Sequence, residues 1–400
     1  MFDVPIKGLS YRDPWGLPLV ERLRMFRAEP VKVAYYYRGP DASTFRYRCF
    51  NTASTVNANL PGVSASWFWE SDGDRLAEVA KEADVLVVCR VPYSDQAAQL
   101  MALARRFGTR VLFDVDDFVF DVAMVPEVVK TLDQYEAEVE PAERMWNWWF
   151  AAFSRMRLTM DLADELIVTN EYLAERTREV IDRPIHIVPN FMGEEQIAYS
   201  RTLVASRAAA GRASDGFFHL GYFSGTPTHN RDLAIASGAV ARLLRSDESL
   251  RLRLVGYLEL KDSPLAGLED RIDVVPLTNY MDLQRLLAET EVNIAPLQDN
   301  RFTNCKSELK YFDAAAVGTP TLASPTYTMS RAIQHEVNGL LVRVDEWDHH
   351  LRYIVDRYQD RGIAMGDAAY EHAHSLYSPA ANAGAVAAAL GLGHGSTPAG

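Results

Sequence analysis

Short apolar runs alternate along the chain with longer stretches in which apolar residues recur every three or four positions. The short runs have the length of β-strands, and the longer stretches have the spacing of amphipathic helices. This alternation is typical of α/β proteins with parallel sheets. It predicts strands at 31–37, 83–91, 109–117, 164–170, 184–190, 217–225, 250–257, 271–277, 291–297 and 318–324. Helices are expected at 74–82, 95–107, 171–180, 231–246, 280–290, 307–317 and 346–359.

The two halves of the chain repeat the same scheme, and 400 residues are enough for two hydrophobic cores. We therefore expect two Rossmann-like domains, at 1–197 and 215–365. Residues 198–216 are small and polar without a clear apolar stripe, so 198–214 is interpreted as a linker or a loose helix followed by one. The last ten residues, 391–400, end in turn formers and are expected to be disordered. Motifs at the strand ends of such domains face the cleft between them.

Composition and charge exclude several classes of function. Acidic residues outnumber basic ones by 54 to 41, which is the opposite of what a nucleic-acid binder needs. Three distant cysteines, Cys49, Cys89 and Cys305, support neither a disulfide framework nor a zinc site, and suggest a reducing cytoplasm. No signal peptide and no run of about 18 apolar residues is seen. We expect a cytoplasmic protein, at most peripheral to the inner face of a membrane.

Two segments of the second half could bind a phosphate group. Residues 221–232 (GYFSGTPTHNRD) follow a strand and precede a helix, and their small residues let backbone N–H groups approach an anion. Residues 304–320 (NCKSELKYFDAAAVGTP) also join a strand to a helix, and they hold two of the seven lysines of the chain. The alternative for 221–232 is a tight turn without a ligand. The alternative for 304–320 is that Lys306 and Lys310 form solvated surface pairs with Glu308.

The stretch from 218 to 342 resembles the donor domain of GT-B glycosyltransferases, specifically the retaining family 4. The resemblance rests on SGTPTHNRD (224–232), LVGY (254–257), VNIAPL (292–297), KSELKYFDAAAVGTPTLAS (306–324) and AIQHEVNGLLV (332–342), in this order. It implies a GT-B fold of two Rossmann-like domains across a cleft, with a C-terminal helix, 366–390, that returns to the first domain. It also implies donor contacts from Ser224, Gly225, Thr226, His229, Asn230, Gly256, Ser307, Glu308, Leu309 and Asp313.

One departure from the family concerns the pair of acids that commonly precedes the Gly-Thr-Pro turn. Asp313 matches the second acid, which orients the nucleotide ribose, but Cys305 occupies the place of the first, which touches the donor sugar. The sugar contact is therefore open. A subgroup with a Lys-Ser-x-Leu-Lys pattern is closer, and there Lys306 would contact the diphosphate.

The first half resembles the family more weakly, through STFRYR (43–48), DVDDFVFD, IVTNEYLAE and HIVPNF. Arg46, Arg48 and Arg90 could reach a diphosphate or an anionic acceptor, because the guanidinium fork pairs with phosphate oxygens. Asp116 and Asp117 would face the acceptor. FDVDD also resembles the nucleophile motif of haloacid-dehalogenase-type phosphatases, so a Mg²⁺-dependent phosphatase using Asp114 and Asp116 is an alternative.

The expected reaction transfers a sugar from a nucleoside diphosphate to a hydroxyl of a glycan, lipid-linked or other acceptor, with retention of configuration. Lys306 and Arg231 would stabilise the departing diphosphate, and Asp116 or Asp117 would act on the acceptor side. No metal or other cofactor is expected, because cationic groups replace it. A catalytically inactive GT-B-like binding or scaffolding subunit remains an alternative, since Cys305 stands where an acid is usual.

Residues 143–160 (ERMWNWWFAAFSRMRLTM) combine a helical core stripe with further aromatic residues. The helix is expected either to be buried on most sides or to expose aromatic side chains to an acceptor or a lipid surface.

Overall fold

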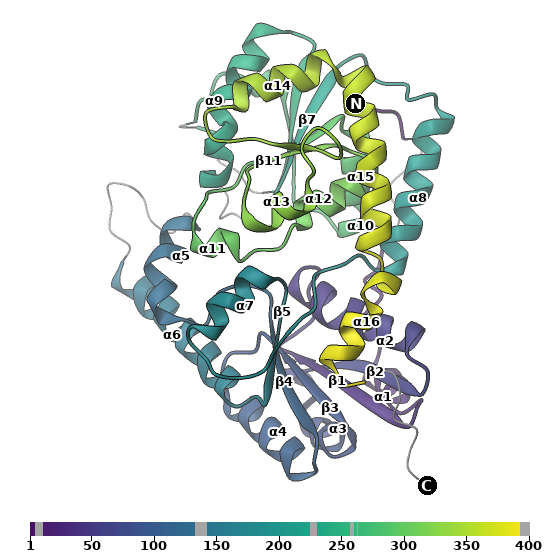
Figure 1. The fold of residues 1–400 in the computed structure, drawn as a ribbon, viewed down its shortest axis with the longest axis vertical. Helices are drawn as coiled ribbons and strands as arrows, with labels where there is room; N and C mark the ends of the chain where they lie inside the picture. The colour runs from purple at the N-terminus through teal and green to yellow at the C-terminus, as the bar shows by residue number, and fades with distance from the viewer. Residues whose placement is uncertain (5–10, 133–141, 225–229, 257–259, 262, 393–400) are drawn as a thin grey trace.

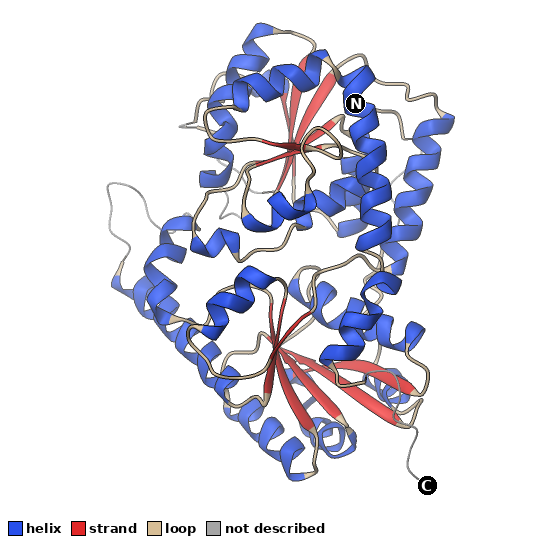
Figure 2. Ribbon diagram, in the orientation of Figure 1, coloured by secondary structure: helices blue, strands red, loops and turns tan. Residues whose placement is uncertain are grey.

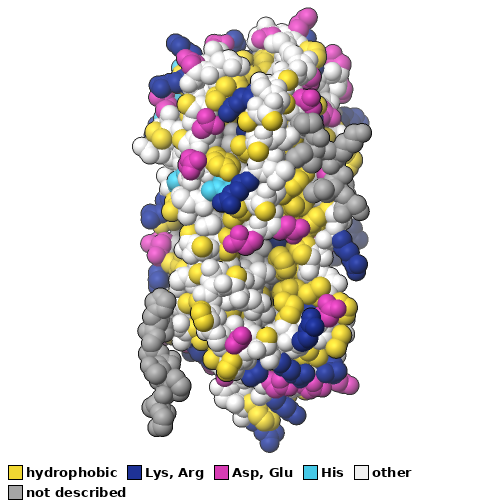
Figure 3. All heavy atoms as spheres, turned by 90° about the vertical axis from the view of Figure 1, so that its right-hand side faces the viewer, with side chains coloured by type: hydrophobic (Ala, Val, Ile, Leu, Met, Phe, Trp, Pro, Cys, Tyr) yellow, Lys and Arg dark blue, Asp and Glu magenta, His cyan; other side chains and the backbone are white. Residues whose placement is uncertain are grey.

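The computed structural model describes residues 1–4, 11–132, 142–224, 230–256, 260–261 and 263–392. The chain forms two α/β domains, each with a six-stranded parallel sheet covered by helices on both faces (Figures 1 and 2). The predicted fold class is confirmed. Basic and acidic side chains are interspersed on the face of the molecule shown in Figure 3.

The first sheet has the strand order β2-β1-β3-β4-β5-β6. Its strands are β1 (Val31–Tyr37), β2 (Val63–Trp69), β3 (Val85–Cys89), β4 (Arg110–Val115), β5 (Glu165–Val168) and β6 (Ile185–Ile187). Strand β2 was not predicted, because VSASWFW is a mixture of small and aromatic residues rather than an aliphatic run. It nevertheless pairs with β1 along its full length, from Val31 with Val63 to Tyr37 with Trp69.

The second sheet has the order β12-β11-β10-β7-β8-β9, the arrangement of a dinucleotide-binding Rossmann domain. Its strands are β7 (Phe218–Phe223), β8 (Leu250–Val255), β9 (Ile272–Val275), β10 (Val292–Ala295), β11 (Thr321–Ala323) and β12 (Leu340–Leu341). Strand order reverses between β7 and β10 here, and between β1 and β3 in the first sheet. Ligands of open α/β sheets bind at such points, so these two strand pairs define where a site is expected.

Each of the seven helices expected at 74–82, 95–107, 171–180, 231–246, 280–290, 307–317 and 346–359 is present, with ends that differ by at most three residues. The described residues form the helices α1 (Leu19–Phe26), α2 (Asn51–Asn59), α3 (Leu76–Glu82), α4 (Asp95–Arg106), α5 (Val125–Thr131), α6 (Glu143–Asp161), α7 (Glu171–Arg178), α8 (Glu194–Ala209), α9 (Asn230–Ser246), α10 (Tyr280–Glu289), α11 (Arg301–Asn304), α12 (Leu309–Ala315), α13 (Tyr327–Ala332), α14 (Trp347–Asp356), α15 (Ile363–Leu376) and α16 (Pro379–Ala389). A π-helix, Arg46–Phe50, leads into α2.

Most of the predicted linker is the regular helix α8, which starts four residues before it. The buried side chains of α8 are those of Gln196, Ile197, Tyr199, Ser200, Leu203 and Arg207. These positions have helical spacing, but three of the six side chains are polar, so the sequence does not show a clear apolar stripe. Arg207 is held by the carbonyls of Ala288 (3.0 Å) and Val317 (2.7 Å) of the second domain.

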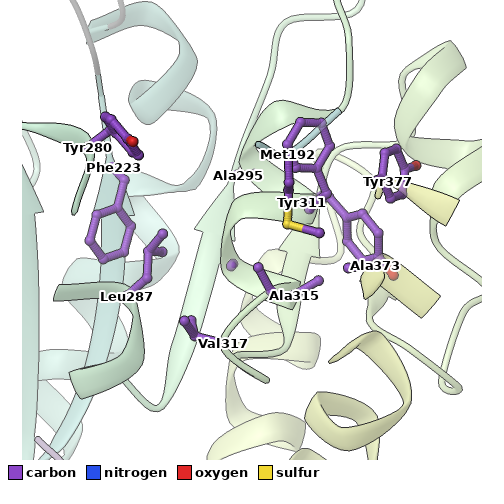
Figure 4. Packing of buried hydrophobic residues seen from close by; sticks show 14 of the residues in the cluster. Met192, Phe223, Tyr280, Leu287, Ala295, Tyr311, Ala315, Val317, Ala373 and Tyr377 are labelled. Carbon is purple, nitrogen blue, oxygen red and sulfur yellow. The ribbon is translucent and has the colours of Figure 1, made fainter. Parts of the chain in front are cut away.

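The end of the chain spans both domains. Helix α15 packs against α12 in the second domain, and α16 packs against α2 and β6 in the first (Figure 1). Tyr311, Ala373 and Tyr377 gather at this junction, and Met192 reaches them from the segment between the domains (Figure 4). One continuous cluster of buried apolar residues therefore extends from the first sheet into the second domain. Within the predicted tail, residues 393–400 lie outside the described residues.

The solvent-facing side of α6 exposes large apolar side chains. Trp148 is 61% exposed and Leu158 is 52% exposed, whereas Met156 and Met160 on the opposite side are buried. Of the two alternatives for this helix, burial on most sides is wrong and exposure of aromatic side chains is observed, because only one side of α6 packs on the domain.

Candidate active site between the two domains

The second domain contributes the segment from Lys306 to Asp313, which follows α11 and enters α12. The carbonyl of Lys306 accepts a hydrogen bond from Thr328 (2.8 Å), and its ammonium lies 4.9 Å from the centre of the Phe302 ring. Ser307 accepts a hydrogen bond from Asn190 of the first domain (2.9 Å). The Glu308 carboxylate accepts one from Tyr377 (2.9 Å), and burial raises its pKa. Leu309 begins α12.

Lys310 points at the carboxyl end of β7. Its ammonium donates to the Phe223 carbonyl, and burial lowers its pKa to about 8. The end of β8 packs tightly against the end of β7, because a Cβ at Gly256 would lie 2.2 Å from the Ser224 carbonyl oxygen. Gly256 also has a φ of 106°. Only glycine is tolerated there. The Lys310 ammonium therefore lies at the carboxyl end of β7, which is one of the two strands at the reversal and packs closely against the end of β8.

Asp313 joins the two domains. Its carboxylate accepts hydrogen bonds from Gln196 of α8 (2.7 Å) and from the Tyr47 hydroxyl of the first domain (3.2 Å). The Gln284 side chain of α10 holds the Asp313 backbone carbonyl (2.5 Å). Burial raises the pKa of Asp313, although Arg46 and these hydrogen bonds oppose the shift. The carboxylate is thus fixed in position by three elements.

The Cys305 side chain lies in an apolar core. Its thiol is fully buried, it packs with Phe302 in the apolar cluster of the first domain, and burial raises its pKa. Its carbonyl accepts a hydrogen bond from Asn170 (2.8 Å). A buried neutral thiol cannot replace a carboxylate that touches the donor sugar.

The first domain contributes a cluster at the ends of β3 and β4. The Arg90 guanidinium contacts Asp116 (2.8 Å) and Asp117 (3.1 Å), and the Thr44 hydroxyl donates to Asp116 (2.8 Å). Burial favours the neutral form of Asp116, but Arg90, Thr44 and Arg48 outweigh it and hold its pKa below the usual value. Arg90 adopts a φ of 46°, in the left-handed region. The structure therefore brings three of the predicted first-domain residues, Arg90, Asp116 and Asp117, together in one ion-pair cluster.

Arg46 and Arg48 lie apart from this cluster. Arg48 is fully buried and pairs with both carboxylate oxygens of Asp114 (2.8 Å each), and it also donates to the Val188 carbonyl (2.7 Å). This differs from the expected ligand contact, because the guanidinium is used inside the domain core. Both carboxylate oxygens of Asp114 are thus bonded to Arg48, so this residue is not free to act as the nucleophile of the phosphatase alternative. Arg46 stacks between the rings of Tyr47 (4.1 Å) and Tyr280 (4.2 Å).

Of the predicted phosphate-binding turn after β7, the residues Gly225, Thr226 and His229 lie outside the described residues. Asn230 is the first residue of α9. Arg231 donates to the Lys130 carbonyl of the first domain (2.5 Å) and so faces α5.

Four polar residues near this site were not predicted. Asn170 and Asn190 lie in the motifs IVTNEYLAE and HIVPNF, so position at a strand end could have indicated them. Gln196 and Gln284 carry no motif, and nothing in the sequence pairs them with Asp313. In the part of the chain that the structure describes, no group of three or more metal-ligating side chains is placed to hold an ion, and no helix could cross a membrane.

The chain is similar to known glycosyltransferases in the sequence of its second domain and in its fold. Residues 218–360 match the family model described as "Glycosyl transferases group 1". No curated protein matches the chain in sequence. Among solved structures, HepE of Anabaena in complex with UDP is 13% identical, with a TM-score of 0.57 over 90% of this chain and 100% of that chain. Sucrose-phosphate synthase of Thermosynechococcus elongatus is 14% identical, with a TM-score of 0.57 over 88% and 96%. A glycosyltransferase of Rickettsia africae is 11% identical, with a TM-score of 0.56 over 90% and 97%.

The chain thus has the fold of a GT-B glycosyltransferase, and its second domain carries a group 1 glycosyl transferase sequence. The predicted resemblance to this class of enzyme is confirmed.

Proposed function

We propose that the protein transfers a sugar from a nucleoside diphosphate to a hydroxyl group of a carbohydrate acceptor. The observation that carries the proposal is that one edge of the first sheet lies against the Lys306–Asp313 segment, while the Arg90–Asp116–Asp117 cluster lies at the ends of β3 and β4 in that same sheet. Asn170 and Asn190, which follow β5 and β6, donate hydrogen bonds to Cys305 and Ser307 of the second domain.

Each side of this juxtaposition suits one half of the reaction. Negative charge develops on the diphosphate as the glycosidic bond breaks, and in this proposal Lys306, Lys310 and backbone N–H groups near Leu309 stabilise it. Asp313 accepts hydrogen bonds from the ribose in the same proposal. Asp116 and Asp117, which pair with Arg90, accept a hydrogen bond from the acceptor hydroxyl in this proposal.

The proposal extends to the stereochemistry of the reaction, its independence of metal, its donor and its acceptor. The resemblance to family 4 supports retention of configuration, with the departing phosphate taking the proton of the incoming hydroxyl on the same face. Cationic side chains take the place of a metal ion. The structures of HepE in complex with UDP and with UDP-glucose make a uridine diphosphate sugar the first donor to test. A glycan or a lipid-linked sugar is the proposed acceptor, in polysaccharide biosynthesis in the cytoplasm, and the exposed face of α6 fits contact with the inner membrane surface.

The experiment is a thermal-shift panel of UDP-, GDP-, dTDP- and ADP-sugars, followed by calorimetry with the nucleotide that stabilises the protein. Asp313→Ala should weaken nucleotide binding about tenfold or more, because it removes the ribose acceptor. An unchanged affinity would remove Asp313 from the site.

Lys306→Ala should lower the rate of donor-sugar transfer or hydrolysis by about 10²-fold or more, while the unfolding temperature stays close to that of the wild type. Near-wild-type turnover would remove Lys306 from the reaction.

The burial of Cys305 favours one second candidate, an inactive GT-B-like binding subunit, because no acid stands at the position that usually touches the donor sugar. Such a protein would bind a nucleotide sugar without consuming it. Release of free sugar from a nucleotide sugar by the purified wild type, abolished by Lys306→Ala, excludes this candidate.

A further inference from the structure

A cavity of about 210 Å³ lies at the junction of the two domains. The π-helix and α2 of the first domain supply one wall, which includes Arg46, Phe50 and Ala58. The starts of α8, α10 and α16 supply the other, which includes Glu195, Tyr280 and Pro379. At about 30 Å³ for each water molecule, the space equals about seven waters, enough for a small organic molecule.

Arg46 is the cationic side chain in this wall, and most of its N–H groups have no hydrogen-bond acceptor among the described residues. It is 4% exposed and is stacked between two tyrosine rings. One of its terminal nitrogens, Nη2, donates to the Tyr47 hydroxyl. Nε and Nη1, which carry three N–H groups, have no hydrogen-bond partner among the described residues. A buried cation with unused donors is costly unless an acceptor reaches it.

The backbone next to Arg46 also favours a negative charge. Helix α8 has 16 residues, its N-cap is Gly193, and no side chain caps it. A Cβ at position 193 would lie 2.9 Å from the Asn51 side-chain oxygen, so glycine keeps α8 close to α2 at this wall. The free N–H groups of a first helical turn carry a partial positive charge.

The rest of the wall limits the ligand to one negative charge. Most of the exposed wall area is apolar, including the contributions of Phe50, Ala58 and Pro379. Glu194 and Glu195 also line the cavity, and Glu195 accepts a hydrogen bond from the Tyr280 hydroxyl (3.0 Å). A doubly charged phosphate would be repelled by these two carboxylates, whereas one carboxylate can pair with Arg46 while an apolar body covers the remaining wall.

We propose that this cavity is a binding site for a small monocarboxylate with an apolar body, whose carboxylate pairs with Arg46 and whose body lies against Phe50, Ala58 and Pro379. The ligand contacts both domains, so its binding favours the relative arrangement of the domains that the structure shows.

Benzoate is the probe, and calorimetry without any nucleotide is the measurement, so the result is independent of the proposed function. One benzoate should bind per chain with a Kd on the order of 1 mM, as expected for a ligand of roughly nine non-hydrogen atoms. Ala58→Trp fills the cavity from an exposed helix position and should weaken binding at least tenfold. Arg46→Gln removes the charge and should have the same effect.

Ala102→Trp is the matched control, because Ala102 is an exposed alanine on α4 and does not line the cavity. Its affinity for benzoate should stay within twofold of the wild type. The proposal is overturned if the wild type does not bind benzoate at 20 times the expected Kd, or if Ala58→Trp binds it as tightly as the wild type. Ala58→Trp also decides the matter if Arg46→Gln does not fold.

Discussion

At the scale of single residues, the position of Lys310 gives it a property that the sequence motif does not convey. Its ammonium is held against the carbonyl at the end of β7, and burial lowers its pKa to about 8. The charge of a lysine is normally constant over the physiological range. Lys310 instead loses its proton a little above neutral pH, in the place where we propose that a diphosphate binds.

We predict that the affinity for UDP falls as the pH rises through about 8. An anion binds better to protonated Lys310, and protonation is complete only below this pKa. The loss is a few-fold to tenfold between pH 7 and pH 9, measured by calorimetry.

Lys310→Arg is the control for this prediction, since a guanidinium keeps its charge throughout the range. Its affinity should change little between pH 7 and pH 9. A wild-type affinity that is constant over this range would contradict the role of Lys310.

How much of the site could be predicted depends on where its residues lie in the chain. Lys306, Ser307 and Asp313 share one motif at a strand end, and Asp116 and Asp117 close another, so the position of each segment is readable from the strand pattern. The partners of Asp313 could not be predicted, because Tyr47 is 266 residues away in sequence and Gln196 is 117 residues away. Their pairing exists only after the two domains have met.

At the scale of elements, the π-helix Arg46–Phe50 sends three successive polar side chains to three places. Arg46 lines the cavity at the domain junction, Tyr47 reaches Asp313, and Arg48 enters the core of the first sheet. In the sequence, RYR reads as one basic group that faces one ligand. Successive side chains of a helix point in different directions, so one turn can contribute to a cavity, a domain interface and a core.

Arg48→Met should destabilise the protein by about 3–5 kcal/mol, because it leaves the Asp114 carboxylate buried without its partner. Urea unfolding measures the loss. Since Arg48 does not reach the site, the affinity of the folded variant for UDP should match that of the wild type.

The double variant Arg48→Met with Asp114→Leu should recover most of this stability, because a pair of apolar side chains replaces a buried ion pair at little net cost. A loss below about 1 kcal/mol in the single variant would show that the pair contributes little.

At the scale of the whole molecule, polar contacts hold the two domains together on both sides of the site. Asn300 of the second domain donates to the Thr131 hydroxyl (3.0 Å), and the Tyr47 hydroxyl reaches Asp313 (3.2 Å). The second of these contacts fixes the carboxylate proposed to bind ribose. Closure and donor binding are therefore expected to depend on each other.

Tyr47→Phe keeps the ring and removes the hydroxyl that donates to Asp313. We expect the affinity for UDP to fall about tenfold, because a hydrogen bond to a charged group contributes about 1.5–3 kcal/mol and part of it is recovered by water. Calorimetry measures the change. Tyr353→Phe, on α14, serves as the matched control and should bind UDP like the wild type. Equal affinities of the two variants would show that Tyr47 does not support the site.

Two of the passages of the chain between the domains, the one before α8 and the one between α15 and α16, are joined. The backbone N–H of Met192 donates to the carbonyl of Tyr377 (2.9 Å), next to the start of α16. A single linker would let one domain swivel about its axis as well as swing open. Two joined passages resist this swivel, because a rotation about either one would break the bond between them. The connectivity of the chain therefore limits the relative orientations that the two domains can adopt.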